Sequence, residues 1–181
     1  FDLNGYKTED DGQKLSGDVD NKIWSLAAAY SLGAHTFTLA HQRSSGDTGY
    51  SYGTVDGNGT IWLANSVQIS DFDRKDQRSW QARYDLNMAT YGVPGLSFMA
   101  RYSSGWNATV REDGVITGTD GKEHELGLQA KYVIQEGAAK DLSFRVAHNL
   151  TRSDKVAGAG ASTTSDVNEV RIFIDYPLDV L

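Results

Sequence analysis

The sequence predicts an all-β protein, a transmembrane β-barrel whose antiparallel strands run up and down in chain order. Seven segments alternate apolar and polar residues, and a shorter segment of the same kind opens the chain. Short and long connections follow each other in turn. Aromatic residues gather near the ends of the alternating segments, as they do in the interfacial girdles of outer-membrane barrels.

The alternating segments share one pattern, which is clear in "SWQARYDLNM" (79–88). Trp80 and Tyr84 fall on one face of this segment, and Gln81 and Arg83 fall on the other. Several segments approach the roughly 9–11 residues that a tilted strand needs to cross a membrane, whereas strands of soluble proteins have about 5–6. The expected strands are 1–7, 22–32, 35–42, 79–88, 96–103, 125–133, 142–150 and 167–178.

The connections between these segments differ in length from one to the next. Short turns are expected at 33–34, 89–95 and 134–141. Long loops rich in Gly, Asp, Ser and Thr are expected at 9–21, 44–77, 104–123 and 152–166. Short turns on one side and long loops on the other are typical of an outer-membrane barrel. A β-sandwich also has alternating strands, but it explains neither these loop lengths nor the aromatic residues at the strand ends.

The polar face of five consecutive expected strands carries one basic residue per strand. These residues are Arg83, Arg101, Lys131, Arg145 and Arg171. A register slip of one residue would move all five into lipid at roughly 2–4 kcal/mol each, so the register is firmly determined. They are either solvated cations paired with nearby carboxylates or a ladder of positive charge in a pore wall that attracts carboxylate solutes. The candidate carboxylates are Asp85, Glu125, Glu169 and Asp175.

The long connection 44–77 differs from an ordinary tether because its middle, "TIWLANSVQI" (60–69), is apolar and alternating. Ordered loops of this length are usually functional. We expect this loop to fold inward and constrict the pore, and an extracellular cap is the alternative.

Composition excludes several other functions. The net charge of −7 argues against a nucleic-acid partner. The absence of cysteine excludes disulfides, thiolate metal sites and cysteine nucleophiles. No apolar run approaches the roughly 18 residues of a membrane helix. The histidines lack metal-ligand spacing and no phosphate-binding or dinucleotide motif occurs, so we predict no catalytic residues, no metal and no cofactor.

Four stretches resemble the C-terminal part of the OprD-type, or Occ, substrate-specific porins of pseudomonad outer membranes. They are "LANSVQISDF" (63–72), "SWQARYDLNMATYGVPGLSFMARY" (79–102), "KYVIQEGAAKDLSFR" (131–145) and "NEVRIFIDYPLDVL" (168–181). The resemblance implies a barrel of 18 strands, within the even-numbered range of bacterial outer-membrane barrels. Residues 1–181 would then form the C-terminal part of one barrel domain and supply about eight strands. The N-terminal strands of the same porin would close the pore.

The resemblance also implies roles for individual residues. Arg145 and Arg171 fall on the family's basic ladder, whereas Ala147 replaces a further arginine of that ladder. Ser66 and Asp71 match a constriction motif that holds the polar or cationic end of the substrate, and Ile69 stands where the best-known member has tyrosine.

The sequence therefore predicts a channel of the bacterial outer membrane that is not an enzyme. Its expected partners are membrane lipid and small carboxylate-bearing solutes, such as basic amino acids, short peptides or simple carboxylates. The alternative is a self-contained eight-stranded barrel that serves as a structural anchor or adhesion protein.

Overall fold

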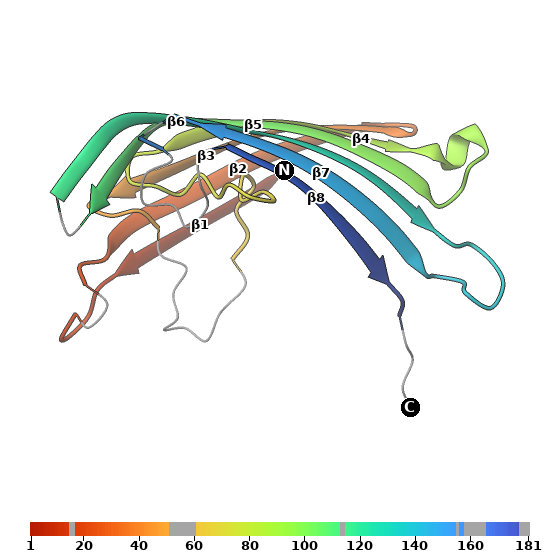
Figure 1. Ribbon diagram of the computed structural model, residues 1–181, viewed down its shortest axis with the longest axis horizontal. Helices are drawn as coiled ribbons and strands as arrows, with labels where there is room; N and C mark the ends of the chain where they lie inside the picture. Colours follow the sequence, from red (N-terminus) through yellow and green to blue (C-terminus); the bar gives the residue numbers. More distant parts are fainter. Residues whose placement is uncertain (15–16, 51–60, 113–114, 155, 158–165, 178–181) are drawn as a thin grey trace.

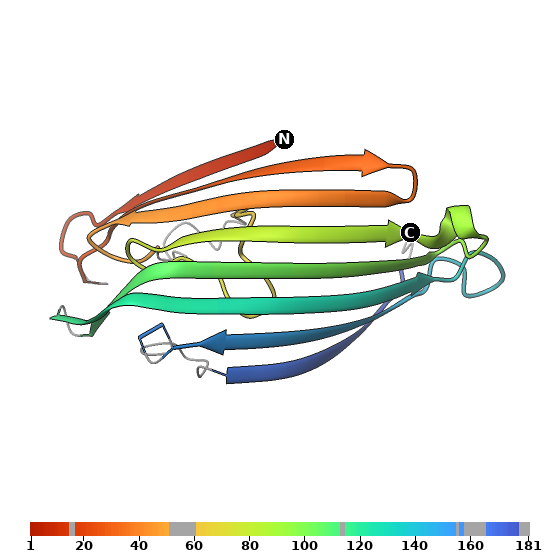
Figure 2. The same ribbon diagram turned by 90° about the horizontal axis from the view of Figure 1, so that it is seen from above.

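Eight antiparallel strands pair in chain order and form one curved sheet, which Figures 1 and 2 show from two sides. The computed structural model describes residues 1–14, 17–50, 61–112, 115–154, 156–157 and 166–177. The predicted all-β, up-and-down antiparallel fold is confirmed. The strands are β1 (Asp2–Glu9), β2 (Asp20–Leu32), β3 (His35–Gly46), β4 (Arg78–Asn87), β5 (Leu96–Glu112), β6 (Val115–Val133), β7 (Ser143–Ser153) and β8 (Asp166–Asp175).

The connections lie at the two ends of the sheet as the sequence predicts, with one correction. The short connections, including the 3₁₀ turn η1 (Met88–Tyr91), lie at one end in Figure 2, and the hairpins β1–β2, β5–β6 and β7–β8 lie at the other. The predicted loop 104–123 is wrong, because β5 and β6 continue pairing through most of it. The polar residues there still pair as strands, because three register shifts and the positive φ angles of Asn107 and Asp120 accommodate the bends of the hairpin.

Burial in this sheet is the reverse of burial in a soluble protein. The concave face buries polar side chains, among them Gln42, Ser79, Ser103 and Glu125, each at most 1% exposed. Tyr30, Leu39 and Ile172, on the convex face, are each more than 60% exposed. An apolar surface of this extent requires an apolar surrounding. The described strands form one sheet, so the β-sandwich alternative, which needs a second sheet over the apolar face, does not apply.

The sheet of the described residues is open. Pairing runs from β1 through β8, and no pairing between β8 and β1 is found among these strands. The self-contained eight-stranded barrel would require that pairing. No helix of the described part of the chain is long and apolar enough to cross a membrane.

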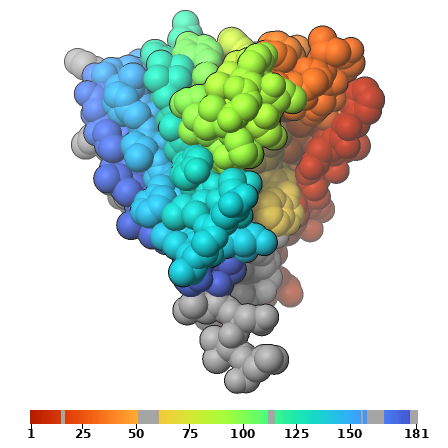
Figure 3. Space-filling model, turned by 90° about the vertical axis from the view of Figure 1, so that its right-hand side faces the viewer, coloured from red at the N-terminus to blue at the C-terminus, as the bar shows by residue number. Residues whose placement is uncertain are grey.

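Residues 61–77, which we call the inner segment, connect β3 to β4 within the curve of the sheet. The yellow trace of this segment lies beneath the arch in Figure 1, and its atoms lie between the red N-terminal strands and the blue C-terminal strands in Figure 3. The loop predicted at 44–77 begins only after Gly46, where β3 ends. Residues 51–60 of that loop lie outside the described residues.

Candidate functional site

The five predicted basic residues lie on the concave face, where antiparallel register orders them along the wall. We call this set the basic ladder: Arg83, Arg101, Lys131, Arg145 and Arg171. Arg83 lies directly opposite Arg101, and Lys131 lies directly opposite Arg145. Arg171 occupies the row between these two pairs. At about 3.3 Å per residue, the ladder extends about 13 Å along the strands.

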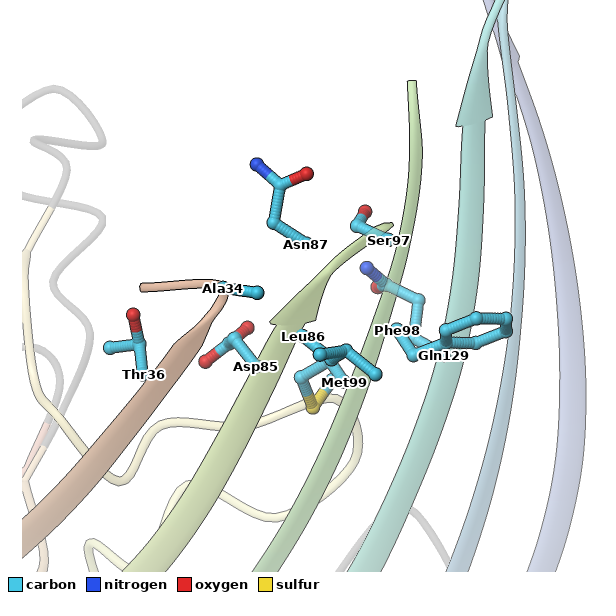
Figure 4. A pocket seen from close by; sticks show the side chains of 9 residues that line it. All are labelled: Ala34, Thr36, Asp85, Leu86, Asn87, Ser97, Phe98, Met99 and Gln129. Atoms are coloured by element: carbon cyan, nitrogen blue, oxygen red, sulfur yellow. The ribbon is translucent and has the colours of Figure 1, made fainter. Parts of the chain in front are cut away.

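The row between the two pairs is otherwise uncharged except for one carboxylate. From β3 to β6 it contains Thr36, Asp85, Met99 and Gln129. Figure 4 shows these four side chains on neighbouring strands, where they line a shallow hollow near the short-turn end. The wall here is therefore polar and lightly charged, so the cations of the ladder dominate its field.

Three rungs of the ladder are neutralised by carboxylates on the same wall. Arg83 donates two hydrogen bonds to Asp85, both at 2.7 Å. Arg171 pairs with Glu169, with a shortest distance of 2.6 Å. Arg101, whose side chain is 14% exposed, lies 3.4 Å from the Glu125 carboxylate. It reaches Glu125 across Gly127, its cross-strand neighbour, where a Cβ would lie 2.9 Å from the Asn149 side-chain oxygen and in ordinary contact with the guanidinium.

The other two rungs form no ion pair with a carboxylate of the described residues. Lys131 forms no ion pair or hydrogen bond with any described residue. Arg145 stacks on Phe173, with its guanidinium carbon 3.8 Å from the ring centroid. A cation–π contact leaves the charge in place, because the ring carries no net charge. The uncompensated positive charge of the ladder is therefore concentrated at Lys131 and Arg145, toward the short-turn end.

Glu125 holds the inner segment to the wall. Its carboxylate accepts hydrogen bonds from three consecutive backbone N–H groups, those of Gln68 at 3.2 Å, Ile69 at 3.1 Å and Ser70 at 2.9 Å. It also accepts from the Thr151 hydroxyl at 3.3 Å. A buried carboxylate that bridges three backbone donors, a hydroxyl and Arg101 fixes both the segment and the ladder residue beside it.

Further buried side chains of the wall bind the rest of the inner segment. Gln42 donates to the carbonyl of Asp71 at 2.8 Å and accepts from the N–H of Asn65 at 3.0 Å. Glu123 accepts from Arg74 at 3.0 Å and from Gln77 at 2.6 Å. These contacts satisfy loop polar groups that would otherwise be buried without partners. The segment is thus a fixed part of the inner wall.

Phe72 approaches the wall where β5 has no side chain. It is 1% exposed, and a Cβ at Gly105 would lie 2.4 Å from its ring. Glycine at this position of β5 therefore allows the inner segment to pack directly against the sheet.

The two predicted site residues of the inner segment lie together. Ser66 donates a hydrogen bond to the Asp71 carboxylate. The neighbouring Gln68 side chain reaches the ladder, and with its amide oxygen turned toward Arg171 it accepts from Nε at 2.9 Å. The segment therefore meets the ladder at Arg101, through Glu125, and at Arg171. Arg83, Lys131 and Arg145 have no described contact with it.

The sequence did not single out Asp73, a second carboxylate of the inner segment. Burial raises its pKa to about 7, and the negative charge of Asp71 adds to the rise. Its backbone carbonyl accepts from the Ser44 hydroxyl at 3.1 Å, which holds the residue against β3. The inner segment therefore contains a carboxylic acid that changes charge near neutral pH.

Titration of Asp73 is expected to loosen the inner segment as pH rises. The folded pKa lies above the unfolded one, so this group stabilises the docked state fully below pH about 4 and loses that contribution as pH rises to about 7. Hydrogen exchange of backbone amides 61–77 should be faster at pH 8 than at pH 5.5 after correction for intrinsic exchange. Asp73→Asn should remove this difference, and an unchanged difference in that variant would contradict the assignment.

A single curved sheet with an apolar convex face, a charged concave face and an ordered inner segment defines the class of outer-membrane β-barrel channels. Comparison with known proteins agrees with this class. The model of the outer membrane porin OprD family matches residues 1–180. The chain is 49% identical to Porin D of Pseudomonas aeruginosa, over 100% of this chain and 43% of that protein. It is 32% identical to the porin-like protein GalP of Pseudomonas putida, over 96% of this chain and 38% of that protein.

Solved structures give the same result. The crystal structure of Pseudomonas aeruginosa OprD matches with a TM-score of 0.83 at 46% identity, over 99% of this chain and 48% of that one. Pseudomonas aeruginosa OccK10 matches with a TM-score of 0.80 at 35% identity, also over 99% of this chain and 48% of that one. This chain belongs to the OprD family of outer-membrane porins, which are channels and not enzymes. It spans less than half the length of these relatives.

Proposed function

We propose that residues 1–181 form the C-terminal part of the barrel of a substrate-specific porin that takes up small carboxylate-bearing solutes by passive diffusion. The N-terminal strands of the same porin close the 18-stranded barrel. The single observation that supports this function best is the uncompensated charge of Lys131 and Arg145 on the concave wall. A fixed positive charge in a narrow, low-dielectric channel attracts carboxylates.

The inner segment supplies the second half of the proposed specificity. It forms the constriction, and Ser66 and Asp71 hold the polar or cationic end of the solute there. Asp71 has one described side-chain partner, the neutral hydroxyl of Ser66, so its charge remains available to a cation. A cationic wall for the carboxylate and an anionic constriction for the ammonium suit amino acids, especially basic ones, and short peptides.

The direct test is uptake of matched solutes by the full-length protein in liposomes. Arginine and lysine should enter faster than glutamate, and all amino acids should enter faster than uncharged sugars of similar size. Equal rates for charged and uncharged solutes of one size would show a general diffusion pore and would overturn the proposal.

Asp71→Asn is expected to reduce the preference for basic over neutral amino acids by about tenfold, because one opposite charge at close range contributes on the order of 1–2 kcal/mol in a partly solvated site. The hydrogen bond from Ser66 can be kept by the amide oxygen, so the segment should stay docked. The measurement is competitive uptake of lysine and a neutral amino acid of similar length. Ser66→Ala serves as the control that removes the hydrogen bond and keeps the charge. A preference that Asp71→Asn leaves unaltered would remove Asp71 from the site.

A further inference from the structure

The convex face carries a cluster of basic residues that the channel does not use. Arg43 on β3 and Arg78 on β4 lie directly opposite each other. The neighbours of each along the chain are buried on the concave face, so both arginines are exposed on the convex face. Lys22 on β2 and Lys122 on β6 are exposed on the same convex face, close to the long-loop end. We call these four residues the outer basic patch: Lys22, Arg43, Arg78 and Lys122.

The patch has no side-chain partner among the residues that the structure describes. None of its four side chains forms a hydrogen bond or an ion pair with a described residue. Asp76, the acidic residue nearest to Arg78 along the chain, pairs with Lys75 at 3.4 Å. Two arginines directly opposite each other on neighbouring strands repel and destabilise a sheet unless an anion lies between them. The patch is therefore complementary to an external anion.

Aromatic side chains surround the arginine pair. Trp24 lies opposite Arg43 on one side, and Trp106 lies opposite Arg78 on the other. His41, two residues from Arg43, contacts both tryptophans, with ring centroids 5.4 Å and 6.5 Å away. Tryptophan rings on the lipid face of a membrane protein mark the level of the headgroups. The arginines consequently lie at headgroup level.

The length of the apolar band supports this position. Arg43 is eight residues from His35 at the opposite end of β3. At about 3.4 Å per residue and a tilt of about 40°, these residues are about 20 Å apart along the membrane normal. The apolar band of an outer-membrane barrel is about 25 Å tall, so Arg43 and Arg78 lie at its edge. His35 at the other edge contacts Tyr84 and Tyr91 instead.

The patch is present at one edge only. On the described strands, the convex side of the short-turn end carries aromatic and aliphatic residues, including Tyr30, Leu32 and Tyr132, and no lysine or arginine. In outer-membrane barrels the long loops face the outside and the short turns face the periplasm. The patch therefore faces the outer leaflet.

From this placement we infer that the outer basic patch binds the phosphate groups of an anionic lipid in the outer leaflet, with Arg43 and Arg78 as its centre. Guanidinium groups bind phosphate oxygens in a bidentate manner. A phosphate between the two arginines removes their repulsion, and Lys22 and Lys122 extend the positive surface to either side. The flanking tryptophans pack against the lipid at the base of its headgroup.

The experiment measures lipid binding to the full-length protein in detergent by native mass spectrometry, with a bisphosphorylated glycolipid (lipid A) as the probe. Arg43→Gln/Arg78→Gln should lower the affinity about 30-fold, because each basic residue at a charged lipid surface contributes about 1 kcal/mol. The matched control is Lys131→Gln/Arg145→Gln, which removes the same charge from the concave wall and should leave lipid binding unchanged.

Three further outcomes decide the inference. Dephosphorylated lipid A should bind wild type and the arginine variant equally. Inorganic phosphate at millimolar concentration should not displace the lipid, because the site also contacts the lipid chains. Equal affinity of wild type and the arginine variant for lipid A, or an equal loss in the control, would overturn the inference. Solute uptake does not enter this measurement, so its result is independent of the proposed transport function.

Discussion

Glu125→Gln is expected to open the pore of the full-length porin, with a higher single-channel conductance and faster entry of uncharged sugars. The carboxylate uses both oxygens to accept from the N–H groups of Gln68, Ile69 and Ser70. A glutamine amide has one acceptor oxygen, so its NH₂ group must face the remaining N–H donor and Arg101. A buried donor left without an acceptor costs about 1–3 kcal/mol. That cost raises the undocked population of the inner segment roughly tenfold or more.

The control for this variant is Glu169→Gln. Glu169 also pairs with a ladder arginine, Arg171, at 2.6 Å, but it has no described contact with the inner segment. Both variants therefore remove the carboxylate partner of one ladder arginine, whereas only Glu125→Gln detaches the segment. Conductance to small ions is compared in the two variants after heat-modifiable migration on gels has shown that each barrel is folded. Equal changes in the two variants would contradict the anchoring role of Glu125.

The faces of the strands were predictable from the sequence because of a simple physical constraint. Side chains alternate between the two faces of a strand, so a register shift of one residue would move every ladder cation into lipid. The alternation in 79–88 therefore determined the side of Arg83, and the same reasoning determined the side of Arg101. The structure has both residues on the concave face, directly opposite each other.

The role of Glu125 was not predictable in the same way. The sequence indicated only a carboxylate that could pair with a nearby cation. Its principal partners are backbone N–H groups of residues 68–70, more than fifty positions earlier in the chain. Nearly every residue has a backbone N–H group, so the sequence does not show which of these groups will bind a carboxylate. The path of the loop depends on its contacts along the whole concave face. The one available signal was a glutamate on the same polar face as the ladder, two residues before Gly127.

The extent of β5 and β6 was mispredicted for a related reason. Where strands each place one apolar face against lipid or a core, a run of Gly, Asp, Ser and Thr stands out from them and indicates a loop. Beyond the membrane a hairpin is solvated, so its composition carries little information on whether it is paired. The isolated bridge between Lys75 and Thr109 shows that this hairpin also contacts the inner segment, which stabilises its extension.

Removal of the uncompensated charge of the ladder is expected to have a large effect on the transport of carboxylate solutes. Lys131→Gln/Arg145→Gln should lower the uptake of carboxylate solutes about tenfold at low salt. Two unit charges about 7 Å apart interact with roughly 0.6 kcal/mol in water and about 2.4 kcal/mol at an effective dielectric constant of 20. In a water-filled pore the lower value applies, so the loss of two such attractions amounts to about 1.2 kcal/mol, which corresponds to nearly tenfold. Uncharged sugars should enter at the wild-type rate, because glutamine keeps the length and polarity of the wall.

Arg83→Gln provides the comparison within the same ladder. Arg83 donates both of its 2.7 Å hydrogen bonds to Asp85, so the pair contributes little net charge to the lumen. Its replacement leaves Asp85 uncompensated and should reduce carboxylate uptake less than the double replacement, by about twofold for one weakly screened charge. Both effects should shrink at 0.5 M salt, where the screening length falls to about 4 Å. If Arg83→Gln lowered uptake as much as the double variant, or if salt had no influence, position along the wall and not uncompensated charge would control permeation.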